Sequence, residues 1–217
     1  MIRVALADDH TLVRKGIRAL LEKWEELEIV SEAENGREAL EQVKNLSPDV
    51  LVMDIAMPEL NGIDATERIK QVNPGTRVVL LSMHAGPALV RRALKAGVKG
   101  YVLKHAITEE LVLAIRAAKR NEPFLSPQVS EILLEDYLAQ RTETEEQNQL
   151  DLLTPREVEV LQLIAEGHTN QHIAHTMNLS IRTVERHRAN LMTKLKIHEV
   201  ASLTRFAIAN NLIFIEE

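Results

Sequence analysis

Residues 50–54 of the chain read Val50-Leu51-Val52-Met53-Asp54, which is four consecutive apolar side chains followed directly by a carboxylate. A run this short that is apolar throughout is typical of a buried strand in a parallel sheet. In sheets of this kind, ligands bind at the carboxyl ends of the strands. The pattern therefore indicates both a parallel fold and a functional position for Asp54.

Similar apolar runs lie on either side of this segment. Residues 2–7 and 29–33 precede it, and residues 78–81 and 100–103 follow it. The segments between these runs place apolar residues three and four positions apart, which is the spacing of a helix with one buried face. Five strand–helix units in succession predict an α/β fold, a doubly wound, five-stranded parallel sheet with helices on both of its faces.

Further polar residues stand at the ends of the predicted strands. Asp8 and Asp9 follow the first strand, Ser82 ends the fourth, and Lys104 follows the fifth. Because the carboxyl ends of parallel strands share one rim, we expect these side chains to surround Asp54. Three carboxylates in one place repel each other unless a cation joins them, and oxygen ligands suit Mg²⁺ or Mn²⁺. With a cation, a hydroxyl and an ammonium group beside it, Asp54 is predicted to attack phosphorus and to carry a phosphoryl group.

This set of residues resembles the receiver domain of bacterial two-component response regulators, over residues 1 to about 120. The resemblance rests on the order and spacing of short motifs, which are Asp8-Asp9, Val52-Met53-Asp54, Met57-Pro58, Asn61-Gly62, Leu81-Ser82 and Gly100-Tyr101-Val102-Leu103-Lys104. It implies a CheY-like fold with Asp54 as the phosphoacceptor. It also implies that Asp9 and Asp54 bind Mg²⁺ directly and that Asp8 acts through water. The main-chain carbonyl of Ala56 completes the protein ligands that the family implies.

The family resemblance further implies a switch beside the phosphoacceptor. Ser82 is expected to move to the phosphate and Tyr101 to pack inward behind it, while Lys104 neutralises the phosphate oxygens. For Tyr101, a plain role in the core explains the sequence equally well. Met83 follows Ser82 at a position where smaller residues are common. We expect its bulk to hinder the attack of water and to prolong the phosphorylated state.

The segment after the predicted sheet has a different character. Ser126-Pro127 is typical of a helix start, with a hydroxyl cap followed by proline. Residues 141–149 hold no apolar side chain, cannot bury a core, and are predicted to form a flexible tether. We therefore expect three parts: a receiver at 1–121, a linker with one helix and a polar tether at 122–150, and a second domain at 151–217.

The remainder of the chain has only helical patterns. Thr154-Pro155-Arg156-Glu157 is a capping box, with a hydroxyl cap, proline at the first helical position and Glu at the third. Thr169 can start a short second helix. Asn178-Leu179-Ser180 is a turn into a longer helix over 181–196, and a last helix covers 200–210. Four helices in this order predict an all-α helix-turn-helix domain.

The predicted helix over 181–196 has an apolar and a polar face. The apolar face is expected to pack inward and consists of Ile181, Val184, Leu191 and Leu195. The polar face is predicted to enter the major groove of DNA and consists of Arg182, Glu185, Arg186, Ala189 and Thr193. Arg186 can pair with guanine, Glu185 can accept from cytosine, and Ala189 can touch a thymine methyl. For Glu185 and Ala189, a solvent-exposed position without a partner explains the sequence equally well.

The charge of this helix favours contact with nucleic acid although the whole chain carries a formal net charge of −6. Local charge decides the attraction to phosphate. The only acidic residue in 181–196 is Glu185, and the basic residues are Arg182, Arg186, Arg188, Lys194 and Lys196. The last three stand at the flanks of the predicted reading face, where phosphate is the expected partner.

Residues 153–213 resemble the LuxR-type helix-turn-helix domain of the NarL/FixJ class. The motifs are Leu153-Thr154-Pro155-Arg156-Glu157, Glu166-Gly167, Thr169-Asn170, Ile173-Ala174, Thr183-Val184, His187, Asn190-Leu191 and Lys194-Leu195. The resemblance implies DNA recognition by the third helix and dimerisation through the last one, and it adds Thr183 and His187 to the expected DNA contacts. The chain departs from the class at Asn178, where Gly is common and where Asn also accepts a positive φ. It departs again at Glu185, where a basic residue is frequent, so base preferences cannot be transferred.

Together these features predict a cytoplasmic transcription regulator of a bacterial two-component system. A sensor histidine kinase is expected to phosphorylate Asp54 and thereby to change homodimerisation and binding to promoter DNA, with RNA polymerase as a further candidate partner. The chain is not expected to be an enzyme beyond slow, Mg²⁺-dependent autodephosphorylation. It has no Cys, which excludes disulfides and thiolate chemistry, and no apolar run approaches the roughly 20 residues of a membrane span.

Two alternatives belong to other functional classes. A phosphatase or hydrolase that uses the Asp54 pocket would need a substrate pocket and a second acid–base group near the nucleophile, and the sequence indicates no such group. A DNA-binding protein that works without phosphorylation would need only a vestigial receiver. The full set of expected pocket residues argues against that alternative.

Overall fold

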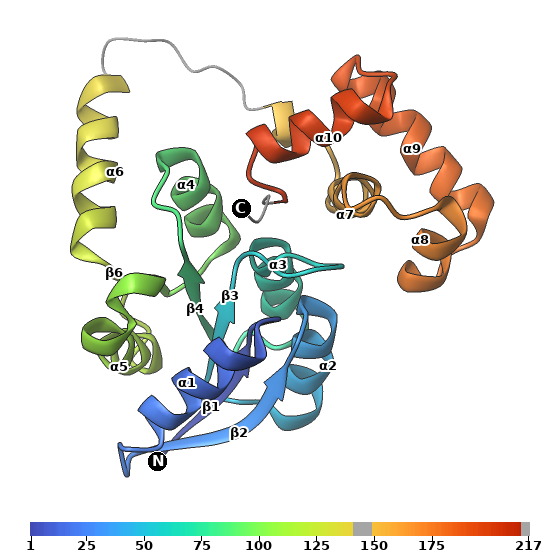
Figure 1. Cartoon of the computed structure of the whole chain (residues 1–217). Helices are drawn as coiled ribbons and strands as arrows, with labels where there is room; N and C mark the ends of the chain where they lie inside the picture. The colour runs from blue at the N-terminus through green and yellow to red at the C-terminus, as the bar shows by residue number, and fades with distance from the viewer. Residues whose placement is uncertain (141–148, 214–217) are drawn as a thin grey trace. The chain divides into compact units, whose positions relative to one another are not determined.

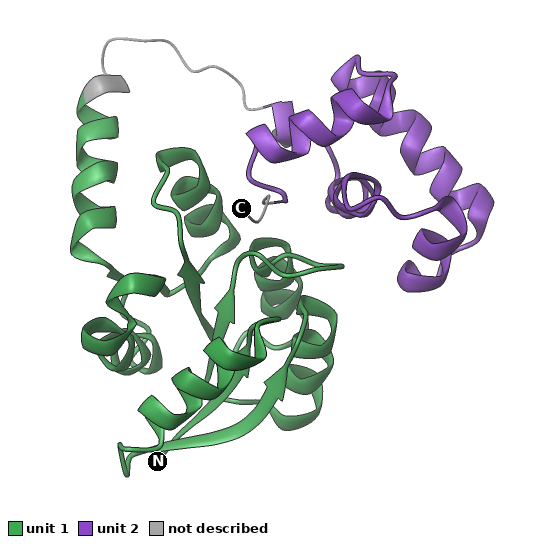
Figure 2. Cartoon of the chain, viewed as in Figure 1, with its two compact units in different colours: residues 1–143 green, residues 144–217 purple. Residues whose placement is uncertain are grey.

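The computed structural model of the chain describes residues 1–140 and 149–213. These residues belong to two compact units, Met1–Glu143 and Thr144–Glu217, shown in separate colours in Figure 2. The tether predicted at 141–149 lies outside the described residues except for Gln149. In the described part of the chain, every helix is too short or too polar to cross a membrane.

Unit 1 alternates strands with helices. Its strands are β1 (Ile2–Ala7), β2 (Leu27–Ala33), β3 (Val50–Asp54), β4 (Arg77–Ser82), β5 (Gly100–Leu103) and β6 (Phe124–Leu125). Its helices are α1 (Thr11–Leu21), α2 (Gly36–Leu46), α3 (Gly62–Val72), α4 (Pro87–Ala96), α5 (Ile107–Lys119) and α6 (Pro127–Gln140). A short 3₁₀ turn, η1 (Lys104–Ala106), precedes α5.

The strands form one parallel sheet in the order β2-β1-β3-β4-β5-β6, which confirms the predicted parallel α/β fold. The predicted number of strands is wrong, because the sheet has six strands instead of five. The additional strand, β6, pairs Phe124 with Gly100 and Leu125 with Tyr101 of β5. Two residues are too few to show a strand period in the sequence, so the pattern gives no sign of β6.

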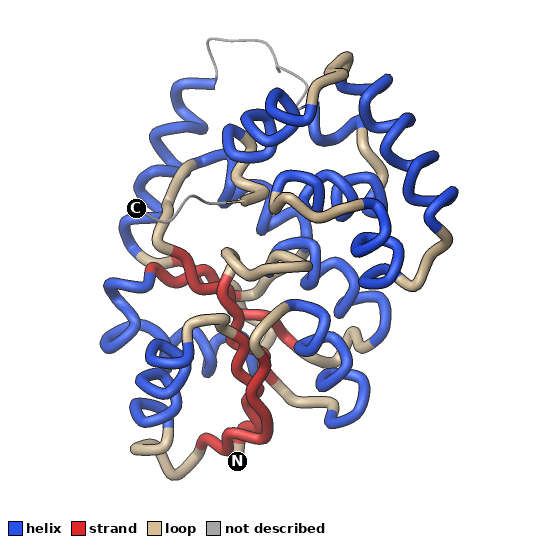
Figure 3. Tube along the Cα trace, turned by 45° about the vertical axis from the view of Figure 1, so that its right-hand side comes forward, coloured by secondary structure: helices blue, strands red, loops and turns tan. Residues whose placement is uncertain are grey.

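Helices cover both faces of this sheet, as Figure 1 and Figure 3 show. On one face, apolar side chains of α1 and α5 join those of β1, β3, β4 and β5 in one buried cluster. Helices α2, α3 and α4 follow one another on the other face. All five residues of β3 are buried in the centre of the sheet. This arrangement brings the carboxyl ends of the central strands to one rim, where Asp54 ends β3.

Unit 2 is helical. After the short 3₁₀ segment η2 (Gln149–Leu152), it contains α7 (Pro155–Ala165), α8 (Asn170–Met177), α9 (Ile181–Leu195) and α10 (Val200–Ala209). The predicted capping box forms, because Thr154 Oγ1 accepts from the Glu157 N–H at 3.3 Å and Glu157 Oε2 accepts from the Thr154 N–H at 2.8 Å. Asn178 ends α8 with a φ of 55°, in the left-handed conformation expected for this turn.

Within residues 149–213, helices α7, α8, α9 and α10 pack around one apolar cluster. Helix α9 contributes Val184, Leu191 and Leu195 to it, as predicted from their spacing. The inward position expected for Ile181 is wrong. This side chain is 47% exposed and lies outside the cluster, because it is the first residue of α9 and the buried contacts of this helix begin only at Val184.

Candidate functional site

The rim of the sheet in unit 1 holds a buried group of charged side chains. Asp8, which follows β1, and Asp54, which ends β3, are 1% and 2% exposed. Lys104, directly after β5, joins them: its Nζ lies 2.7 Å from Asp54 Oδ2 and 3.0 Å from Asp8 Oδ2. The strand ends therefore bring together three residues that are 46 or more positions apart in the sequence, as their expected positions require.

Two further potential ligand groups, those of Asp9 and His10, stand beside these two carboxylates. Asp8, Asp9, His10 and Asp54 each offer one potential ligand atom, and these atoms all lie within 4.8 Å of one another. The position of His10 was not among the predictions. Its Nδ1 lies 2.9 Å from Asp9 Oδ1, and the Asp9 carboxylate raises the pKa of His10 above its ordinary value. Three carboxylates at this spacing, balanced by one ammonium group, are a donor set that fits a hard divalent cation.

The charge state of Asp54 follows from its surroundings. Burial raises its pKa to about 6, while the Lys104 ammonium and a hydrogen bond from the Ala56 N–H oppose that rise. At neutral pH the group is therefore mostly a carboxylate, which is the form that acts as a nucleophile. Burial alone would lower the pKa of Lys104, but the Asp54 and Asp8 carboxylates outweigh it and raise that pKa. The ammonium group therefore stays charged across the physiological range.

The backbone at Asp54 is held in place by a close neighbour. Gly62, the first residue of α3, donates its N–H to the Ile55 carbonyl at 3.0 Å. A Cβ at this glycine would lie 2.2 Å from the carbonyl oxygen of Asp54. Asn61 caps the same helix by accepting from the N–H groups of Ile63 and Asp64. The Asn61-Gly62 motif thus allows α3 to begin directly against the main chain of Asp54.

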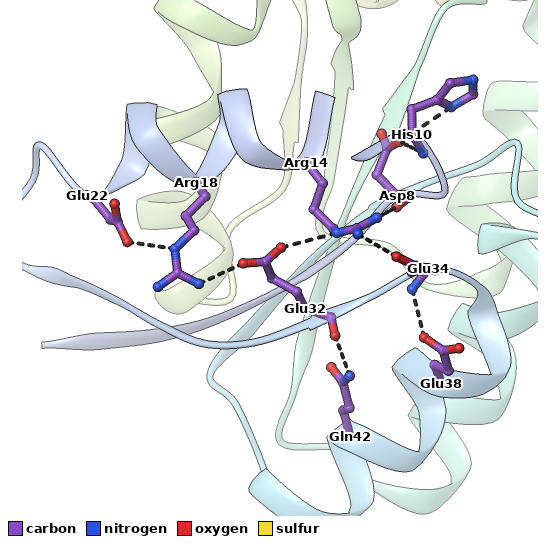
Figure 4. A network of polar contacts seen from close by, with 9 residues as sticks. All are labelled: Asp8, His10, Arg14, Arg18, Glu22, Glu32, Glu34, Glu38 and Gln42. Carbon is purple, nitrogen blue, oxygen red and sulfur yellow. Dashed lines mark hydrogen bonds and ion pairs between the residues drawn. The ribbon is translucent and has the colours of Figure 1, made fainter. Parts of the chain in front are cut away.

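A polar network behind Asp8 holds the acidic loop, and its central residue, Arg14, is one that no pattern in the sequence predicts (Figure 4). Arg14 of α1 is only 7% exposed. It donates to the carbonyl oxygen of Asp8 at 2.5 Å, to Glu32 Oε2 at 3.1 Å and to Glu34 Oε1 at 2.7 Å. Figure 4 shows Arg18 of the same helix holding the other side of the Glu32 carboxylate, at 2.7 Å. Arg14 therefore connects the main chain of the site to α1 and to the end of β2.

The predicted switch residues are also close together. Ser82 is 2% exposed, and its Oγ accepts from the His84 N–H and donates to the His84 carbonyl, both at 2.9 Å. Tyr101 is fully buried, and its OH donates to the same carbonyl at 2.6 Å. Burial raises the pKa of Tyr101 to about 12, so the phenol remains a donor. Main-chain atoms of His84, in the loop after β4, thus bond to both the Ser82 hydroxyl and the Tyr101 hydroxyl. Met83, which stands between Ser82 and His84 in the sequence, is 67% exposed.

In unit 2, the side chains predicted to read DNA lie on α9. Arg182, Glu185, Arg186 and Ala189 are exposed, while Thr183 and His187 are half-buried. Ser180 caps the helix and accepts from the Thr183 N–H at 3.1 Å. The residues predicted to read bases therefore lie on the exposed face of α9, opposite the apolar cluster.

Two of the predicted phosphate contacts have partners within unit 2. Lys194 Nζ lies 2.6 Å from Glu157 Oε2, and this carboxylate is 3% exposed. Arg188 Nη1 donates to Asn170 Oδ1 of α8 at 3.0 Å. Both side chains thus link α9 to the helices before it. Glu157 was predicted as part of a capping box, but its ion pair with Lys194 depends on a separation of 37 residues that local patterns do not reveal.

Two family models match the chain. Residues 4–116 match the response regulator receiver domain, and residues 151–207 match the bacterial regulatory proteins of the luxR family. The two matches fall on the two units one by one, and the first contains the whole rim from Asp8 to Lys104.

Curated relatives match over nearly the whole length. The oxygen regulatory protein NreC of Staphylococcus epidermidis is 34% identical over 98% of this chain and 99% of its own length. NreC of Staphylococcus haemolyticus is 33% identical over the same shares of both chains.

Solved structures match as well. RcsB of Salmonella enterica serovar Typhimurium, bound to a promoter in the presence of phosphomimetic BeF₃⁻, has a TM-score of 0.64 and 29% identity, over 96% of this chain and 98% of its own. A LuxR-family two-component response regulator from Aurantimonas sp. has a TM-score of 0.62 and 36% identity, over 64% of this chain and 99% of its own.

Proposed function

The chain belongs to the family of response regulators that join a receiver domain to a LuxR-type DNA-binding domain, and on that basis we propose that phosphorylation of Asp54 controls its binding to promoter DNA. The observation that carries the proposal is the buried group at the rim, in which Lys104 contacts both Asp54 and Asp8. A buried carboxylate beside a fixed ammonium group is arranged to receive a phosphoryl group whose negative charge needs compensation.

In the proposed reaction, a phosphohistidine of a sensor histidine kinase is the donor. A carboxylate oxygen of Asp54 attacks phosphorus, an oxygen–phosphorus bond forms, and the phosphorus–nitrogen bond to the histidine breaks. The histidine nitrogen leaves with the bonding electron pair. Lys104 already lies 2.7 Å from Asp54 Oδ2, so its charge is in place for the transferred oxygens without large movement.

The cofactor that fits the site is Mg²⁺ or Mn²⁺. Asp9 and Asp54 would bind it directly, Asp8 through water, and the Ala56 carbonyl would complete the protein ligands. When bound, the ion would neutralise charge on the phosphoryl oxygens and on the three carboxylates. In the described structure, Lys104 performs part of that neutralisation by itself.

Phosphorylation is proposed to act through the loop after β4. The Ser82 hydroxyl, now paired with His84, would turn to donate to a phosphoryl oxygen. Tyr101 donates to the same His84 carbonyl, so the tyrosine would respond to the same movement. The difference in contacts between the two states is what supplies the energy for the change.

The output is proposed to be binding of double-stranded promoter DNA by α9, by a homodimer of the phosphorylated chain. Arg182, Glu185, Arg186 and Ala189 are exposed on this helix and suit contacts with base edges. Thr183, His187, Arg188 and Lys194 flank them and are proposed to contact the DNA backbone or to orient the helix. RcsB, a similar protein, has been solved as a complex with DNA. RNA polymerase is a further proposed partner at the promoter.

The deciding experiment compares the chain with its Asp54→Asn variant. DNA fragments are first identified by genome-wide mapping, and their affinity is then measured with and without acetyl phosphate and Mg²⁺. The wild-type chain is expected to gain one phosphoryl group by mass spectrometry and to change its DNA affinity, and Asp54→Asn to do neither. Glu28→Gln, which removes one exposed carboxylate on β2, serves as the control and should behave as wild type.

Other outcomes of this experiment favour the alternatives. DNA affinity that is the same for both chains under both conditions would indicate a DNA-binding protein with a vestigial receiver. In a separate assay of the same chain, sustained release of phosphate from a small phosphomonoester would indicate a phosphatase.

Slow autodephosphorylation is a further part of the proposal. Met83 directly follows Ser82 and is exposed, and its bulk is proposed to hinder the approach of water to the phosphoryl group. We expect Met83→Ala to shorten the lifetime of phosphorylated Asp54, measured by loss of label in the presence of Mg²⁺. An unchanged lifetime would show that Met83 does not shield the group.

A further inference from the structure

Ser126 is a buried hydroxyl at the point where β6 passes into α6. It is 1% exposed, and three hydrogen bonds attach it to the sheet and to α5. Its N–H donates to the Tyr101 carbonyl at 2.9 Å, and its Oγ accepts from the Leu103 N–H at 3.1 Å. The same Oγ donates to the Glu110 carboxylate. The Ser126 carbonyl accepts from the Ser130 N–H of α6 at 3.0 Å, as at any helix start, but its Oγ accepts from β5, whereas the Oγ of an ordinary serine cap accepts from an N–H of its own helix.

The part of β5 that Ser126 contacts is the part that serves the proposed site. Tyr101 donates its OH to the carbonyl of His84, in the loop that follows Ser82, and the Ser82 hydroxyl bonds to the same residue. Leu103 directly precedes Lys104, whose ammonium group contacts Asp54. Ser126 therefore bonds to the main chain on both sides of the strand segment that lies between the tyrosine and the lysine.

A second attachment joins α6 to the element on the other side of the switch loop. Asp136 of α6 forms an ion pair with Arg91 of α4. Between the two attachments, Val129 of α6 is fully buried. Helix α4 begins at Pro87, directly after the loop of residues 83–86 that connects it to β4. Helix α6 is thus bonded to β5 at its start and to α4 nearly three turns later.

We propose that Ser126 is a positioning residue through which α6 detects movement of α4 relative to β5, so that α6 carries the state of the receiver toward the DNA-binding unit. The proposal rests on the proposed function, because it assumes that phosphorylation moves the switch loop. If that loop shifts α4 while the Ser126 hydrogen bonds keep the start of α6 on β5, the Arg91–Asp136 pair and the Ser126 bonds cannot both keep their present geometry. Helix α6 must then tilt or lose one of these contacts. Either response gives α6 two states, and the balance between them depends on both β5 and α4.

The experiment uses the full chain with Mg²⁺, with and without beryllofluoride as a phosphoryl mimic. Two quantities are measured: amide hydrogen exchange over residues 127–138, and the ratio of DNA affinities in the two conditions. The variants are Ser126→Ala, Ser126→Thr as the conservative rescue, and Ser130→Ala as the matched control. Ser130 lies one turn further along α6 and is exposed, and its hydroxyl donates to the Ser126 carbonyl at 3.4 Å, so its change removes a hydroxyl from the same helix start but no bond to β5.

Ser126→Ala is expected to take up the mimic as wild type does but to lose the change in exchange over α6, and to lower the ratio of DNA affinities about fivefold or more. Ser126→Thr should restore both, because it keeps the hydroxyl. A Ser126→Ala chain with a wild-type ratio and wild-type exchange would overturn the inference. A wild-type chain whose DNA affinity does not respond to the mimic would instead overturn the proposed function itself.

The ion pair gives a second test that does not depend on how well Ser126→Ala folds. Arg91→Asp and Asp136→Arg are each expected to reduce the response of α6 exchange to beryllofluoride, and the double exchange of the two charges is expected to restore it. Such a rescue requires direct contact between α4 and α6 to carry the response. If both single variants respond as wild type does, the second attachment has no part in the switch and the inference is wrong.

Discussion

Gly62 illustrates how one small residue sets the position of the proposed phosphoacceptor. Gly62, the first residue of α3, lies so close to the end of β3 that an added Cβ would be 2.2 Å from the Asp54 carbonyl oxygen and 3.1 Å from the Ile55 Cα. Real side chains do not tolerate such distances, so the main chain would have to move. Because Asp54 ends β3 at this point, that movement would separate its carboxylate from Lys104.

We therefore expect Gly62→Ala to lower the rate of phosphoryl uptake and to reduce the free energy of unfolding by about 1–3 kcal/mol, the range for an overpacked core. Gly16→Ala is the matched control. It makes the same change in the middle of α1, where a Cβ would have no neighbour within 4 Å, and should raise stability by up to about 1 kcal/mol. Denaturant unfolding and uptake from acetyl phosphate measure the two effects, and an uptake rate equal to wild type would contradict the prediction for Gly62.

The residues at the rim differ in how far the sequence predicts them. Asp8, Asp54 and Lys104 each end or follow an apolar run, so the parallel topology alone places them together. Arg14 gives no such signal, because on α1 it looks like an ordinary solvated base. Its burial depends on the Glu32 and Glu34 carboxylates, which reach it from another strand end. Pairings between distant segments of this kind are invisible to a pattern read along the chain.

Helix α9 has a structural bond at its end as well as a reading face. Lys194 Nζ contacts the Glu157 carboxylate, which also completes the cap of α7. Burial alone would raise the pKa of Glu157, but the hydrogen bonds from Lys194 and Thr154 outweigh it and hold that pKa below its ordinary value. A carboxyl group with a depressed folded-state pKa stabilises the fold above its unfolded pKa, and this stabilisation is lost as pH falls through the folded value.

We expect Lys194→Met to destabilise unit 2 by about 1 kcal/mol at neutral pH, a modest effect because the lysine is partly exposed and solvent screens the pair. The difference from wild type should be constant above pH 4.5, the ordinary pKa of Glu, and should shrink below it. Amide exchange in α7 and α9 of the full chain, measured from pH 3 to 7, tests this. Lys196→Met, an exposed lysine after α9, is the control. A difference that grows toward low pH would show that the sign is wrong.

The elements show the same division between local and distant information. Helix boundaries at Thr154, Thr169 and Ser180 follow from caps that lie beside them in the sequence, and each cap forms. Strand β6 could not be predicted, since two residues have no period and its pairing partner in β5 lies more than twenty positions earlier. The exposure of Ile181 could not be predicted either, because it depends on where along α9 the contacts with the other helices begin.

In the molecule as a whole, the receiver domain and the DNA-binding domain are two separate units. The receiver match covers residues 4–116 and the luxR match covers residues 151–207, so each family model falls within one unit. The formal charge of −6 belongs to the chain as a whole, while the basic residues of α9 lie in the second unit. For a protein that reads DNA with one unit and receives a signal with the other, this separation lets each surface have the charge that its partner requires.

Strand β6 also determines where the chain can be cut. It lies on the outer margin of the sheet and bonds the main chain of Gly100 and Tyr101. A fragment that ends at residue 121, the boundary predicted from the sequence, would lack β6 and α6. The backbone groups of β5 that bond to β6 would lose their partners, and the surface that buries Val129 would be exposed to solvent. An edge strand with unpaired N–H and C=O groups can pair with a strand of another chain. We expect light scattering to show that residues 1–121 self-associate and that residues 1–140 remain monomeric. If residues 1–121 are monomeric and as stable as residues 1–140, then β6 does not protect the edge of β5 from pairing.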